Sequence, residues 1–130
     1  MLQEDVGILV IEDVQAMQVQ IRELLTQIGF SRIVVVDNGI EARHVLNNQL
    51  IQLILCDWHM TPVTGLELLS YVRSTMSLKR IPFIMVTAEN TRSLVLEAVR
   101  FGVDDYLLKP LTSDQVGNKV YALLIKHQVL

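Results

Sequence analysis

Short apolar segments alternate with longer amphipathic segments along the chain. Each short segment is rich in Ile, Val and Leu at successive positions, which is typical of strands that helices cover on both faces. Five such segments predict strands: Val6–Ile11, Ile33–Val36, Ile51–Cys56, Pro82–Val86 and Tyr106–Leu108.

Segments with helical spacing lie between these strands. Their apolar residues recur every three or four positions, so that each helix presents one apolar stripe to a sheet. The stripes are Met17, Ile21, Leu24, Leu25 and Ile28, then Leu66, Leu69 and Val72, and then Val116, Val120, Leu123 and Leu124. Capping signatures at Asn38–Glu41, Thr64–Glu67 and Thr112–Gln115 mark helix starts, and Gly29 marks the end of the first helix.

The repeated order of strand and helix predicts an α/β fold. Right-handed crossovers between parallel strands then put helices on both faces of one sheet. In such sheets the functional site lies beyond the carboxyl ends of the strands. Those ends are therefore where functional residues should be sought.

Composition narrows the class of protein further. A chain of 130 residues predicts a single domain over residues 1–130. The net charge of −3 without a basic block argues against a nucleic-acid-binding surface. The longest uncharged stretch, His44–Cys56, is far shorter than the about 20 apolar residues of a membrane span. The lone Cys56 and the acidic start, which is unlike a signal peptide, lead us to expect a cytoplasmic protein without membrane contact.

Polar residues follow most of the predicted strands. Glu12 and Asp13 follow the first, Asp57 the third, Thr87 the fourth and Lys109 the fifth. Because these ends share one edge of the sheet, the carboxylates should lie together, and their repulsion calls for a cation. Oxygen ligands favour Mg²⁺, which binds few carboxylates together with waters and a phosphate oxygen. With Lys109 and Thr87 nearby, Asp57 is the expected nucleophile for a transferred phosphoryl group.

These motifs resemble the receiver domain of two-component response regulators, and most of all the single-domain chemotaxis regulators within that family. The resemblance extends over about Val6–Leu124. It rests on Glu12-Asp13, Asp57-Trp58-x-Met60, Gly65, Thr87-Ala88, Gly102, Asp105-Tyr106 and Lys109-Pro110. It implies a flavodoxin-like (βα)5 three-layer sandwich with a parallel sheet of order 2-1-3-4-5.

The resemblance also implies the chemistry. Asp57 would accept a phosphoryl group from a sensor histidine kinase or phosphotransfer protein. Asp13 and Asp57 would bind Mg²⁺ directly, Glu12 through a water, and His59 through its backbone carbonyl. Lys109, held by a cis bond before Pro110, would pair with the phosphoryl oxygens. Thr87 and Tyr106 would form the switch pair, so that the protein is a switch acting only on its own phosphorylation and dephosphorylation rather than an enzyme.

The sequence departs from the family pattern near Asp57. Glu12 stands where aspartate is commoner, and Pro62 lies one position later than the usual proline after the methionine. His59 either contributes only its carbonyl or brings its imidazole to the phosphoryl group and alters hydrolysis. Cys56 is expected to be an inert buried residue, and Trp58 is expected to be a loop residue that covers the edge of the core. The basic residues Arg22, Arg73, Lys79 and Arg80 are expected to be solvated surface charges.

The segment from Leu94 to Phe101 is apolar on more than one face of a helix. If Leu94, Ala98 and Phe101, or Leu96 and Ala98, face the sheet, other apolar residues must face outward. We expect an apolar patch beside Lys119, made of Val95, Val99, Val103 and Tyr106. On the receiver interpretation this patch would bind a downstream protein or a second receiver.

Three other functions remain to be separated from this one. A phosphoaspartate hydrolase of the haloacid-dehalogenase type needs a different motif after the first strand and a cap domain for which the chain has no room. A degenerate receiver would act as a scaffold independent of phosphorylation. The chain could also be the receiver part of a longer regulator with an output domain.

Overall fold

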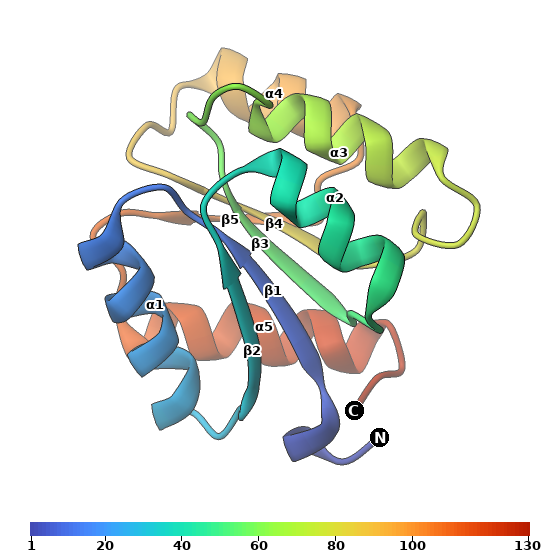
Figure 1. The fold of residues 1–130 in the computed structure, drawn as a ribbon. Helices are drawn as coiled ribbons and strands as arrows, with labels where there is room; N and C mark the ends of the chain where they lie inside the picture. The colour runs from blue at the N-terminus through green and yellow to red at the C-terminus, as the bar shows by residue number, and fades with distance from the viewer.

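The computed structural model describes residues 1–130 and contains one sheet of five parallel strands (Figure 1). The strands are β1 (Gly7–Ile11), β2 (Arg32–Val36), β3 (Leu53–Asp57), β4 (Phe83–Thr87) and β5 (Asp105–Leu108). Their spatial order is β2-β1-β3-β4-β5, so the predicted flavodoxin-like topology is confirmed. Each predicted strand is present with its ends displaced by no more than two residues.

Helices cover both faces of this sheet. They are α1 (Gln15–Gln27), α2 (Gly39–Asn48), α3 (Gly65–Ser74), α4 (Arg92–Arg100) and α5 (Ser113–Lys126), with a short 3₁₀ helix at Gln3–Asp5. In Figure 1, α1 and α5 lie on one face and α2, α3 and α4 on the other. No helix has the length and apolar character needed to cross a membrane.

The core has one apolar layer on each side of the sheet. Alternate residues of β1 point to opposite layers, so that Leu9 packs toward α2 and α3 whereas Ile8 packs toward α1 and α5. Every residue of β1, β3 and β4 is buried, as the continuous apolar segments predicted. This rigid three-strand centre fixes the residues at its carboxyl edge.

The three predicted helix caps are present. The side chains of Asn38, Thr64 and Thr112 accept hydrogen bonds from the backbone three residues later, which satisfies free N–H groups at the starts of α2, α3 and α5. Gly29 ends α1 with a φ of +108°, a conformation that other residues seldom adopt.

Helix α4 buries fewer apolar side chains than expected if Leu94, Ala98 and Phe101 all faced the sheet. Ala98 is buried and Leu94 packs against the core, but Phe101, the residue after the end of α4, is exposed. The expectation that Phe101 faces the sheet is therefore wrong, and so is the alternative with Leu96. Leu96, Val99 and Phe101 are 52%, 57% and 43% exposed, respectively.

Candidate functional site

Three carboxylates meet at the carboxyl edge of the sheet. Glu12 and Asp13 directly follow β1, and Asp57 is the last residue of the neighbouring strand β3. One oxygen from each lies within 4.8 Å of the others. Glu12 and Asp57 are buried and Asp13 is exposed. The arrangement concentrates negative charge in a site that is open to solvent on the Asp13 side.

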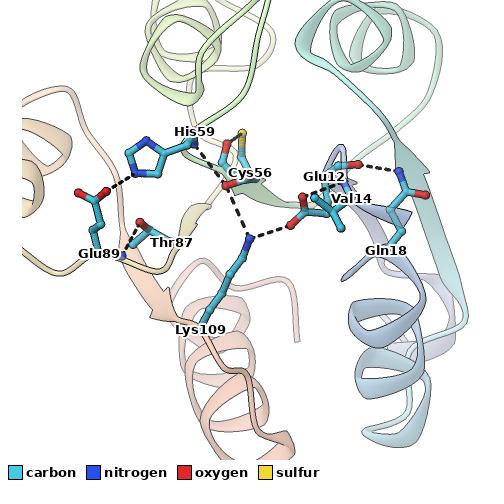
Figure 2. A network of polar contacts seen from close by, with 9 residues as sticks. Glu12, Val14, Gln18, Cys56, His59, Thr87, Glu89 and Lys109 are labelled. Atoms are coloured by element: carbon cyan, nitrogen blue, oxygen red, sulfur yellow. Dashed lines mark hydrogen bonds and ion pairs between the residues drawn. The ribbon is translucent and has the colours of Figure 1, made fainter. Parts of the chain in front are cut away.

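Lys109 is the one cationic side chain paired with this cluster. Its Nζ lies 3.0 Å from Glu12 Oε1 and 3.9 Å from Asp57 Oδ1 (Figure 2). The residue follows β5, and its backbone N–H donates to the Thr87 carbonyl at 2.8 Å. The Lys109–Pro110 peptide bond is cis, as predicted. One positive charge among three carboxylates leaves an excess of negative charge.

Glu12 is held by contacts with Val14 and Gln18, at the start of α1, and with Lys109 after β5. Its Oε2 accepts a hydrogen bond from the Val14 backbone at 3.2 Å, and its own carbonyl accepts one from Gln18 Nε2 at 2.6 Å. Burial raises the pKa of Glu12, and the charge of Asp57 adds to this effect, whereas the hydrogen bonds from Lys109 and Val14 act in the opposite direction. The cluster therefore disfavours its own full negative charge.

His59 and Thr87 lie on the other side of Asp57. The backbone N–H of His59 donates to Asp57 Oδ1 at 3.3 Å, so this residue orients the carboxylate. Its imidazole Nε2 lies 3.8 Å from Glu89 Oε1 (Figure 2). The buried Thr87 hydroxyl accepts a hydrogen bond from the Glu89 backbone at 3.0 Å.

Gln18 and Glu89 contact this site, although the sequence did not lead us to assign either of them to it. Gln18 Nε2 also donates to Asp37 Oδ1 at 2.6 Å, so it joins the end of β1 to the residue after β2. Glu89 lies two residues after Thr87, so its place just beyond a polar strand end could have identified it as a candidate site residue from the sequence.

The loop after Asp57 is closely packed. A Cβ on Gly65 would lie 2.6 Å from Trp58 Cε3, so α3 can begin here only with a glycine. The Thr61–Pro62 peptide bond is cis, and Trp58 is buried in the core as expected. Cys56 is also buried, and burial raises the pKa of its thiol, in agreement with an inert residue.

Tyr106 lies on β5, apart from the carboxylates. Lys119 Nζ is 4.4 Å from the centre of its ring and donates to its carbonyl oxygen. Val95, Val103 and Tyr106 are half-buried, the latter two against the core, and Val99 is exposed. The four predicted surface residues thus differ in exposure, while Lys119 lies beside Tyr106 as expected.

The chemistry of the donor set fits a hard divalent cation. All of the candidate ligands are oxygens, and the exposed Asp13 leaves one side of the cluster open to water, as Mg²⁺ prefers. A cation there would relieve the repulsion that Lys109 alone does not balance. The edge also offers Thr87 as a hydroxyl donor and Lys109 as a fixed charge, which together suit the oxygens of a phosphoryl group.

Sequence and structure comparisons give one consistent result. Residues 8–121 match the response regulator receiver domain. The chain is 35% identical to the chemotaxis protein CheY of Pseudomonas aeruginosa over 87% of this chain and 91% of that protein. It is 31% identical to CheY-3 of Vibrio cholerae over 92% of each.

Solved structures agree with these sequence matches. The receiver domain of a signal transduction histidine kinase from Syntrophus aciditrophicus aligns with a TM-score of 0.84 at 26% identity over 93% of this chain and 91% of that chain. CheY4 of Vibrio cholerae aligns with a TM-score of 0.86 at 22% identity over 92% of this chain and 98% of that chain, which shows a shared fold.

Proposed function

Because this chain belongs to the response regulator receiver domain family, as its motifs predicted, we propose that Asp57 is its phosphorylated residue. Receivers are signalling switches rather than classical enzymes, and they interact with histidine kinases and downstream targets. The observation that supports the assignment is a buried carboxylate, Asp57, with Lys109 Nζ at 3.9 Å and two further carboxylates beside it. We take residues 1–130 to act as one receiver domain.

Receiver domains bind Mg²⁺ at an acidic pocket, and the cluster of Glu12, Asp13 and Asp57 supplies the oxygen ligands that such a pocket needs. In this proposal Asp13 and Asp57 bind the ion directly, together with the His59 carbonyl, and Glu12 binds it through a water. When bound, Mg²⁺ offsets the charge of the phosphoryl oxygens.

Asp57 has one oxygen available for the transfer. Both of its polar contacts, with His59 N–H and Lys109, are made by Oδ1. Oδ2 is therefore the oxygen that attacks the phosphorus of a phosphohistidine. The new P–O bond gives an acyl phosphate, the P–N bond breaks, and the imidazole leaves with the electron pair. Lys109 stabilises the phosphoryl oxygens through its charge, and hydrolysis by water later restores the carboxylate.

Thr87 and Tyr106 form the switch in this proposal. The Thr87 hydroxyl now accepts from the Glu89 backbone, so its proton is free to be donated to a phosphoryl oxygen. Movement of Thr87 toward that oxygen opens space into which the Tyr106 ring turns, away from Lys119. The change alters a surface that binds a downstream protein or a second receiver, made of Val95, Val99, Val103, Tyr106 and Lys119.

Intact-mass measurement after incubation with acetyl phosphate and Mg²⁺ tests the assignment. We expect the added mass of one phosphoryl group, lost on treatment with hydroxylamine, and no adduct in Asp57→Asn or in the presence of EDTA. Asp114→Asn changes an exposed carboxylate on α5 and should leave the adduct unchanged. An equal adduct in Asp57→Asn would refute the assignment, and no adduct in the parent protein would favour the scaffold alternative.

A further inference from the structure

A cavity of about 430 Å³, widely open to solvent, lies at the edge of the sheet opposite the carboxylates. Its lining comes from residues that precede β3 and β4 and from the end of α5, whereas the carboxylates follow the strands. Its volume falls in the lower part of the range of about 300–1,000 Å³ found for small-molecule sites. It shares no residue with the phosphorylation site.

The lining combines an apolar wall with positive charge. Ile51, Ile81 and Val129 contribute apolar surface. Arg80 and His127 contribute the ionisable groups, and no carboxylate lines the cavity. Arg80 is exposed and takes part in none of the ion pairs of the structure, so its charge is available to a ligand. The chemistry matches a molecule with an apolar body and a negative charge.

Contacts behind the wall hold the cavity in shape. His127 Nε2 lies 3.5 Å from Asp104 Oδ1, which turns this nitrogen inward. The other oxygen of Asp104 accepts hydrogen bonds from Arg73 Nη2 at 2.9 Å and from the Phe83 backbone at 2.7 Å. The carboxylate of Asp104 is therefore paired with Arg73, which reduces its repulsion of an anion.

Arg73 also fixes the loop that carries Arg80. Its Nη1 donates to the carbonyls of Lys79 at 3.1 Å and Ile81 at 2.7 Å, on either side of Arg80. The guanidinium thus ties the loop between α3 and β4 to the rest of the wall. The backbone that carries Arg80 is thus ordered before a ligand binds, which lowers the entropy lost on binding.

We propose that this cavity binds a small organic carboxylate. The carboxylate pairs with Arg80, and the apolar body packs against Ile51, Ile81 and Val129. This site is independent of the proposed phosphorylation, because its residues lie at the other edge of the sheet.

Titration of ¹⁵N-labelled protein with phenylacetate, followed by amide NMR shifts, tests this proposal. We expect saturable shifts at Ile51, Ile81 and Val129, and weaker binding of the neutral phenylacetamide. Arg80→Gln should weaken phenylacetate about tenfold, as expected for loss of a charge-assisted hydrogen bond. Lys79→Gln removes the same charge one residue away from the lining and serves as the matched control.

Three outcomes would overturn the proposal. Equal binding of phenylacetate and phenylacetamide would overturn the proposal, as would equal weakening by Arg80→Gln and Lys79→Gln. Shifts confined to the carboxylate edge or to α4 would also overturn it. Binding that persists unchanged in Asp57→Asn would show that the cavity acts apart from the phosphorylation site.

Discussion

Replacing Asp57 by asparagine should stabilise the metal-free protein. The oxygens of Glu12 and Asp13 lie within 4.8 Å of Asp57, and with an effective dielectric constant of about 20 two like charges at that limit repel by about 3.5 kcal/mol. The attraction of Asp57 to Lys109 at 3.9 Å is about 4 kcal/mol on the same scale. The repulsions together exceed the attraction, and burial of Asp57 adds to the cost of its charge. After allowance for solvent at the exposed Asp13, we expect a gain of about 1–2 kcal/mol.

Urea unfolding in EDTA, followed by Trp58 fluorescence, measures this gain. The unfolding midpoint of Asp57→Asn should rise by roughly 0.5–1 M, given usual urea dependences for small domains. Glu23→Gln changes an exposed carboxylate outside the cluster and should leave the midpoint unchanged. Added Mg²⁺ should stabilise the parent more than the variant, because only the parent keeps all of the proposed ligands. A lower midpoint for Asp57→Asn in EDTA would refute the reasoning, since attraction to Lys109 would then outweigh repulsion.

Three further predictions concern Mg²⁺ binding, the proposed output surface around Val99 that binds a downstream protein, and the buried thiol of Cys56. Asp13→Asn should weaken Mg²⁺ about tenfold or more in a titration of Trp58 emission, and an unchanged affinity would remove this residue from the ligand set. Val99→Asp should leave phosphorylation at Asp57 intact but abolish phosphorylation-dependent partner binding or self-association; retained binding would move the output surface elsewhere, for example to α1. Burial raises the pKa of Cys56, so only the unfolded chain ionises as the pH rises past the ordinary value of 9.0. The free energy of unfolding should therefore fall above that pH by up to about 1.4 kcal/mol per pH unit, and urea midpoints in Cys56→Ala should show a smaller decline.

The fold could be predicted because strands and helices differ in apolar spacing. All predicted strands formed, and the predicted stripe on α5 is buried in full. Helix α3 shows the limit of such patterns, since Leu68 is buried as completely as Leu69 although only the latter was in the predicted stripe. Where a helix packs between two neighbours, its buried face is wider than one stripe. Phe101 is exposed although it has helical spacing from Leu94 and Ala98, which shows that spacing alone does not determine which apolar residues at a helix end are buried.

The members of the carboxylate cluster could be predicted from strand ends alone. Parallel topology brings the ends of β1, β3 and β5 to one edge whatever the details of packing. The partners of long side chains could not be predicted in this way. Arg73 is a clear case, because it is not the solvated charge that was expected: it donates to three carbonyls and to Asp104. Such contacts depend on loops brought together only in the folded chain.

The balance of charge distinguishes the two edges of the sheet. At the edge where the strands begin, the single carboxylate of Asp104 accepts hydrogen bonds from Arg73 and from the Phe83 backbone N–H. That arrangement is complete without a ligand, and its role is to hold the α3–β4 loop and the start of β4 together. At the carboxyl edge, one lysine serves three carboxylates, and the pKa of Glu12 is raised as a consequence of burial and of Asp57. Because the protein leaves the charge of this cluster unbalanced, a cation would complete it. Asp104 and the cluster therefore differ in the partners of their carboxylates rather than in residue type.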